Sequence, residues 1–183
     1  MEDKLILDMR KSRKTREKGF RELVRMTKRN LYWQIRRMVS SHEDADDILQ
    51  EVYIKVFRNI SSFKGNSSLS TWIYRIAYNE TVNFLKSKSK QNSINDISLE
   101  DIAEKKSNGV SFFDTENINN LIKKAILTLP ERQREVFVLR YYNNVPFKEM
   151  EKQMHITESA LKTSYHIAEK KIKEVLLTEQ LNF

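Results

Sequence analysis

The sequence contains no cysteine among its 183 residues. This absence excludes a disulfide framework, a zinc site with thiolate ligands and catalysis by a thiol nucleophile. Long apolar runs are also missing, because the longest one is the four-residue segment 136–139, far below the ~18 residues that a membrane-spanning helix needs. The N-terminal residues include no apolar segment typical of a secretion signal. We therefore expect a cytoplasmic protein without membrane insertion.

Glycine and proline are scarce, with three and two residues respectively. Hairpins, Rossmann nucleotide sites and phosphate-binding loops all depend on these residues, so the sequence predicts an all-α fold. The three histidines, His42, His155 and His166, lack the carboxylate or thiol spacing of a metal site. No nucleophile elbow or other catalytic motif is recognisable, and we expect neither a metal, nor a cofactor, nor enzymatic activity.

The net charge of +8 is distributed unevenly, which indicates two domains and a polyanionic partner. Residues 1–90 hold 20 basic and 11 acidic side chains, residues 91–115 hold 2 and 5, and residues 116–183 hold 11 and 9. The acidic middle segment also loses apolar periodicity and exceeds the usual length of a connection within one domain. We predict two small helical domains, 1–90 and 116–183, joined by a flexible linker at 91–115.

Apolar residues at steps of three and four predict three helices in the first domain. The first spans about 19–40, the second follows a capping box formed by Ser41 and Asp44, and the third spans about 69–88. A loop at 63–70 with Gly65 separates the last two. The apolar stripe of the first helix contains Phe20, Val24, Thr27, Leu31, Ile35 and Met38.

Two polar surfaces in this domain are candidate interfaces. Opposite the apolar stripe of the second helix lie Asp47, Gln50, Glu51 and Ile54, which form either a solvated acidic surface or a protein-docking surface. On the third helix a stripe beside Trp72 contains Arg75, Asn79, Asn83 and Lys86. Asparagine can read a base edge, arginine and lysine bind phosphates, and an exposed aromatic ring stacks on an unpaired base; a solvated polar face is the alternative.

The second domain ends in a helix-turn-helix pattern. We predict four helices here. The first spans 116–128, and the second begins with Pro130 at its first helical position. The third spans 147–154, and the fourth runs from a cap at Thr157 to about residue 177. The last two, with a turn of about three residues, form the helix-turn-helix, although a plain helical bundle gives a similar pattern. The outward face of its second helix contains Glu158, Ser159, Lys162, Thr163 and His166.

Three segments in this order resemble bacterial RNA polymerase sigma factors of the extracytoplasmic-function group. They are ADDILQEVYIKVF at 45–57, FKGNSSLSTWIYRIAYNETVNFLK at 63–86, and LTLPERQREVFVLRYYNNVPFKEM at 127–150, followed by the helix-turn-helix. The resemblance covers roughly residues 17–90 and 116–178. It implies a non-catalytic initiation factor that binds core RNA polymerase, directs it to a subset of promoters and helps to melt the −10 region.

The resemblance also implies roles for particular residues. Core polymerase would bind through its β′ coiled coil and its β subunit, promoter DNA would bind at the −10 and −35 elements, and an anti-sigma factor would hold the protein inactive. The linker would pass through the active-site and RNA-exit channel. The polymerase-binding residues would be Asp47, Gln50, Glu51 and Ile54; the −10 residues Phe63, Lys64, Asn66, Ser67, Trp72, Arg75, Asn79, Asn83 and Lys86; and the −35 residues Glu158, Ser159, Lys162, Thr163 and His166.

Four positions depart from the family pattern in the second domain. Glu151 replaces a small residue, His155 replaces the turn glycine, and Ser164 and Ile167 replace two arginines. We expect a looser or tilted helix pair and altered −35 recognition. The alternative function is a helix-turn-helix regulator that binds duplex DNA without joining polymerase, and it does not need the face that contains Asp47.

Overall fold

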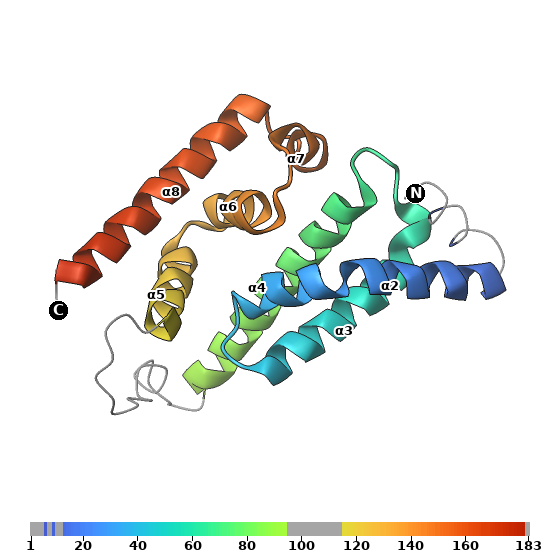
Figure 1. Ribbon diagram of the computed structural model, residues 1–183, viewed down its shortest axis with the longest axis horizontal. Coiled ribbons are helices and arrows are strands. Elements are labelled where there is room, and N and C mark those ends of the chain that lie inside the picture. The colour runs from blue at the N-terminus through green and yellow to red at the C-terminus, as the bar shows by residue number, and fades with distance from the viewer. Residues whose placement is uncertain (1–5, 7–8, 10–12, 95–114, 182–183) are drawn as a thin grey trace.

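The computed structural model describes residues 6, 9, 13–94 and 115–181. Within these ranges the chain contains helices and no strand, which confirms the all-α prediction (Figure 1). None of these helices combines the length and apolarity needed to cross a bilayer. The elements are α2 (Arg13–Arg36), α3 (His42–Asn59), the 3₁₀ turn η1 (Ile60–Ser62), α4 (Leu69–Ile94), α5 (Thr115–Thr128), α6 (Glu131–Asn143), α7 (Phe147–Met154) and α8 (Glu158–Leu181).

Some helix ends differ from the sequence prediction. Helix α2 begins at Arg13 rather than near residue 19, and α4 continues to Ile94 rather than ending near residue 88. Both extensions have a mainly polar sequence and contain no proline, so the helical backbone hydrogen bonds can continue through them. Helix α2 also ends four residues earlier than expected: a turn follows it, in which Met38 N donates to Ile35 O at 2.8 Å and Arg36 Nη1 donates to Val39 O at 2.9 Å. Most of the predicted linker, 95–114, lies outside the described residues.

The caps of the helices explain several boundaries. Ser41 is the N-cap of α3 as predicted, and its Oγ accepts a hydrogen bond from Asp44 N at 2.9 Å. Pro130 and Pro146 are the N-caps of α6 and α7. The prediction that Pro130 occupies the first helical position is therefore wrong by one residue, because its extended ψ of 143° puts it outside the helix.

The first half of the chain has its own hydrophobic core. Helices α2, α3 and α4 pack around it, together with η1 and Met9. Of the stripe predicted for α2, Leu31 and Ile35 are fully buried in this core, and Phe20 packs against it. Met38 lies beyond the end of α2 and belongs to the second cluster, and Leu23, rather than half-buried Val24, is buried in the core. The other fully buried members include Ala45, Val52, Val56, Ile73 and Ala77.

A second hydrophobic cluster crosses from the first half to the second. Met38, Tyr78 and Val82 pack in it against residues of the C-terminal half. Those partners are Ala125, Ile126, Leu129, Phe137, Val138, Ala168 and Ile172. Helices α6 and α7 consequently lie beside α4 (Figure 1), so the two halves are in direct contact.

Candidate polymerase and nucleic-acid interfaces

The predicted docking face on α3 is open to solvent. Asp47, Gln50 and Glu51 are exposed, and 39 % of the surface of Ile54 remains accessible. Within the described ranges, no side chain forms a hydrogen bond or ion pair with the three polar residues. Glu43, one turn before Asp47 and also exposed, extends this acidic face. Its spacing of four residues from Asp47 is the sequence signal that places it there.

The loop between α3 and α4 combines exposed polar residues with buried rings. Phe63 is only 6 % exposed and belongs to the core of the first half, where its ring centroid lies 5.3 Å from that of half-buried Trp72. Lys64 and Asn66 are exposed. Gly65 has a φ of +73°, a left-handed conformation that glycine adopts without strain. In this arrangement Phe63 stabilises the core, whereas the polar tip of the loop is accessible.

A pocket of about 310 Å³ lies where this loop, α4 and α7 meet. Seven of the nine residues predicted for −10 binding line it, and Asn83 and Lys86 lie beyond it on α4. The pocket is also lined from the other half of the chain, by Lys152, Gln153 and His155 of α7 and its following turn. The predicted −10 residues thus come together, but a wall of their pocket belongs to the C-terminal half.

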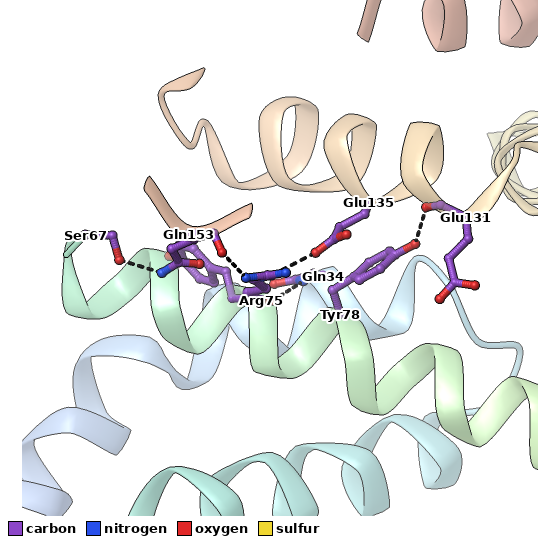
Figure 2. A network of polar contacts seen from close by, with 8 residues as sticks. Gln34, Ser67, Arg75, Tyr78, Glu131, Glu135 and Gln153 are labelled. Atoms are coloured by element: carbon purple, nitrogen blue, oxygen red, sulfur yellow. Dashed lines mark hydrogen bonds and ion pairs between the residues drawn. The ribbon is translucent and has the colours of Figure 1, made fainter. Parts of the chain in front are cut away.

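Both predicted phosphate-binding cations on α4 have carboxylate partners on α6. Arg75 Nε lies 3.0 Å from Glu135 Oε1, and its Nη1 donates to the carbonyl oxygen of Gln153. Lys86 Nζ lies 3.0 Å from Glu131 Oε2. Figure 2 shows Arg75 between Glu135 and Gln153, with Tyr78 directed at the backbone of Glu131. The Arg75 pair is partly buried, whereas both side chains of the Lys86 pair are more than half exposed.

The start of α4 is occupied by another carboxylate. Glu149 of α7 accepts hydrogen bonds from Ser68 Oγ at 2.8 Å, from Ser68 N at 3.3 Å and from Thr71 Oγ1. Burial alone would raise the pKa of Glu149, but the hydrogen bonds from Thr71 and Ser68, with nearby Lys152, lower it below the ordinary value. Glu149 is consequently ionised at neutral pH, as a helix N-terminus favours.

The asparagine stripe lies beside these contacts. Asn79 and Asn83 are both exposed on α4. At 100° per residue, Asn79 is displaced by about 40° from Arg75 and about 20° from Lys86, and Asn83 by about 80° and about 60° from the same two residues. The amides that were predicted to read bases are accessible, while the neighbouring cations are held by α6.

The outward face of α8 is exposed. Ser159, Lys162, Thr163 and His166 are accessible, and Lys162 Nζ lies 2.7 Å from Oε1 of Glu158. The hydrogen bond with Lys162 lowers the pKa of the Glu158 carboxyl. Nothing from the first half of the chain is bonded to these side chains in the described structure.

Two departures in the helix-turn-helix are accommodated locally. Glu151 Oε1 accepts a hydrogen bond from Glu158 N at 3.3 Å, so this side chain caps α8 rather than only separating the two helices. His155 has a φ of 55° and ends α7 in the left-handed conformation that a glycine would adopt more easily. The exposed Ile167 and half-buried Ser164 lie on α8, where they offer no cation to DNA.

Comparisons with known proteins identify both halves. The family model for Sigma-70 region 2 matches residues 23–91, and that for Sigma-70, region 4 matches residues 119–172. The ECF RNA polymerase sigma factor SigW of Bacillus subtilis is 29 % identical over 86 % of this chain and 89 % of its own. The ECF RNA polymerase sigma-E factor of Haemophilus influenzae is 30 % identical over 73 % of this chain and 75 % of its own.

Solved structures show the same fold. CnrH, in complex with the cytosolic domain of CnrY, superimposes with a TM-score of 0.69 over 97 % of both chains, at 15 % identity. RpoE of Bartonella quintana, in complex with the anti-sigma factor NepR, superimposes with a TM-score of 0.63 over 87 % of this chain and 97 % of its own, at 19 % identity.

Proposed function

The chain belongs to the ECF RNA polymerase sigma factors. We propose that its two halves recognise different elements of the promoter. Residues 1–90 bind core polymerase and the −10 element, residues 91–115 link the halves, and residues 116–183 bind the −35 element. The protein acts as an initiation factor rather than as an enzyme, in the cytoplasm with the polymerase.

The observation that carries the proposed polymerase contact is the exposed face of α3. It presents carboxylates and one aliphatic side chain, Ile54, from a half of the chain that is otherwise strongly basic. Interfaces commonly join an apolar centre to a polar rim. This composition supports docking of Asp47, Gln50 and Glu51 on the β′ coiled coil, with the β subunit as a further contact.

The −10 and −35 assignments draw on the two exposed polar surfaces. Asn79 and Asn83 read bases of the −10 element, while Lys64, Arg75 and Lys86 bind phosphates and the pocket beside Trp72 receives an extruded base. Lys162, Thr163 and His166 on α8 read the −35 duplex. The low net charge of residues 116–183 favours weak DNA binding by this half alone.

We also propose an anti-sigma partner. The solved structure of RpoE contains the anti-sigma factor NepR, and that of CnrH contains the cytosolic domain of CnrY. A partner of this kind would control when the protein reaches polymerase.

Co-purification with core polymerase, followed by transcription from genomic fragments, tests the function. We expect Asp47→Ala with Gln50→Ala to weaken core binding. Asn59→Ala should leave it unchanged, because exposed Asn59 lies on the same helix about 120° from Asp47 and about 180° from Gln50. A wild-type chain that neither binds core nor changes start sites contradicts the function and favours a regulator of duplex DNA. Equal affinities of all variants contradict the docking face alone.

A further inference from the structure

Helix α8, the second helix of the helix-turn-helix, has an apolar edge beside its polar reading residues. Ala160, Thr163 and Ile167 are exposed and follow one another at steps of three and four residues. At 100° per residue they lie within an arc of about 60°. Ile167 keeps 41 % of its surface accessible. We call these three residues the apolar edge of α8.

Packing within α8 and its neighbours does not account for this edge. The buried side of α8 contains Leu161, Ala168 and Ile172, which belong to two of the apolar clusters. At 100° per residue, Ile167 lies about 100–140° from these three residues. Ile167 therefore projects away from the core, and contact with a partner would remove its side chain from water.

Thr163 contributes a methyl group rather than a hydroxyl donor to this edge. Its Oγ1 donates a hydrogen bond to Ser159 O at 3.1 Å, one turn earlier in α8. Threonine in a helix commonly makes this bond to the preceding turn, and the bond fixes the side-chain rotamer. Because the hydroxyl proton is used inside the helix, the methyl group of Thr163 continues the apolar surface of Ile167 toward Ala160.

The polar side chains beside the apolar edge have carboxylate partners on α8 itself. Lys162 Nζ lies 2.7 Å from Glu158 Oε1, and His166 Nδ1 lies 3.6 Å from Glu169 Oε2. A contact between DNA and Lys162 or His166 must exchange these partners. In the described structure the exposed part of the apolar edge meets water, and removal of apolar surface from water is favourable.

Thymine offers the matching group in the major groove of duplex DNA. Its C5-methyl is contacted there by apolar groups such as alanine and the methyl of threonine. Recognition helices contact base edges through their N-terminal residues, and the apolar edge occupies the third to the tenth residue of α8. The edge is about 10 Å long at 1.5 Å per residue, which corresponds to about three base pairs at 3.4 Å each.

We propose that the apolar edge of α8 reads thymine in the −35 element, with Ile167 in contact with the C5-methyl group of one base. The inference rests on the proposed function, which assigns the −35 duplex to α8. Isoleucine offers no donor to guanine and no acceptor to the amino group of cytosine. Either base would therefore lie against a side chain that leaves its polar groups unpaired, and thymine is preferred.

Selection from a library of duplexes with a randomised segment tests this preference. The full chain is used in two forms, assembled with core polymerase and alone at low ionic strength, where phosphate attraction is strongest. We expect wild type to enrich thymine and Ile167→Ala to lose the enrichment at one position; alanine favours a helix more than isoleucine does, so the fold is kept. Leu177→Ala is the matched control, because exposed Leu177 lies on the same helix about 15 Å farther along, and it should keep the wild-type preference.

Deoxyuridine at the enriched positions then tests the contact with the methyl group itself, because it pairs as thymine does but lacks the C5-methyl. Wild type should bind the deoxyuridine duplex about 4-fold more weakly, the effect of leaving one carbon unburied. Ile167→Ala should bind the thymine and deoxyuridine duplexes equally. Thr163→Ser, which removes only the methyl group, should lose the response to deoxyuridine at a neighbouring position.

Three results overturn the inference. They are no enrichment of thymine with either form of the chain, equal binding of the thymine and deoxyuridine duplexes by wild type, and an unchanged response to deoxyuridine in Ile167→Ala. A chain that does not bind core polymerase would contradict the proposed function. The selection with the chain alone does not use polymerase, so it would still decide whether the apolar edge reads thymine.

Discussion

Arg75 and Glu135 form an ion pair between α4 and α6, with Nε and Oε1 3.0 Å apart across 60 residues of sequence. The arginine side chain is 34 % exposed and the glutamate side chain 14 %. A partly exposed pair of this kind contributes little alone, about 0–1 kcal/mol. The packing of the two halves therefore depends on all the polar contacts between α4 and helices α6 and α7, together with the shared apolar cluster.

Asn79→Ala should reduce discrimination at one position of the −10 element. An amide that bonds a base edge distinguishes the correct base by ~1–3 kcal/mol, and Asn79 is exposed beside the pocket. Transcription by the reconstituted holoenzyme from a promoter library with a randomised −10 element measures this preference. Asn59→Ala, at the exposed end of α3, should preserve it. An unchanged base preference in Asn79→Ala would remove this residue from the reading set.

His155→Gly should stabilise the protein. His155 has a φ of 55° at the end of α7, and a side chain in this conformation costs about 1 kcal/mol that glycine avoids. Urea unfolding of the full chain, followed by circular dichroism, measures the change. His155→Ala keeps a Cβ and should give no such gain. Equal midpoints for wild type and His155→Gly would show that the turn is not strained.

Acidification should weaken the contact of Glu149 with Ser68 and Thr71. Its pKa in the compact state lies below the ordinary 4.5, because hydrogen bonds from Thr71 and Ser68 outweigh the effect of burial. The ionised carboxylate therefore stabilises the compact state above about pH 4.5, and this contribution disappears as the pH falls through the lowered pKa. Urea unfolding of wild type and Glu149→Ala at several pH values measures this contribution. The difference in the free energy of unfolding should be constant at neutral pH and shrink on acidification. A difference that persists in acid contradicts this assignment.

Local features of the fold were predictable because they depend on neighbouring residues. The steps of three and four in α2 identified the stripe that contains Leu31 and Ile35, and the Ser41 cap fixed the start of α3. Where neither a cap nor a repeating apolar stripe marks the end of a helix, as in α4 beyond residue 88, the sequence predicts an end that is too early. Periodicity detects burial, and polar turns can extend a helix without it.

The partners of the predicted site could not be read from the sequence. Helical geometry placed Arg75 and Lys86 on one face, but it did not indicate what covers that face. Their partners Glu135 and Glu131 are separated from them by 60 and 45 residues, and the hydrophobic cluster that brings the halves together draws on both. Such contacts follow from tertiary packing, which no local pattern encodes.

Met38, Tyr78 and Val82 share a hydrophobic cluster with the C-terminal half. The equilibrium between packed and separated halves should therefore depend on temperature. Separation exposes these side chains to water, and exposure of apolar surface raises the heat capacity. Apolar attraction weakens on cooling, so chilling should shift the population toward separated halves. The accessibility of the −10 face in the free protein would thus vary with temperature even at constant composition of the solution.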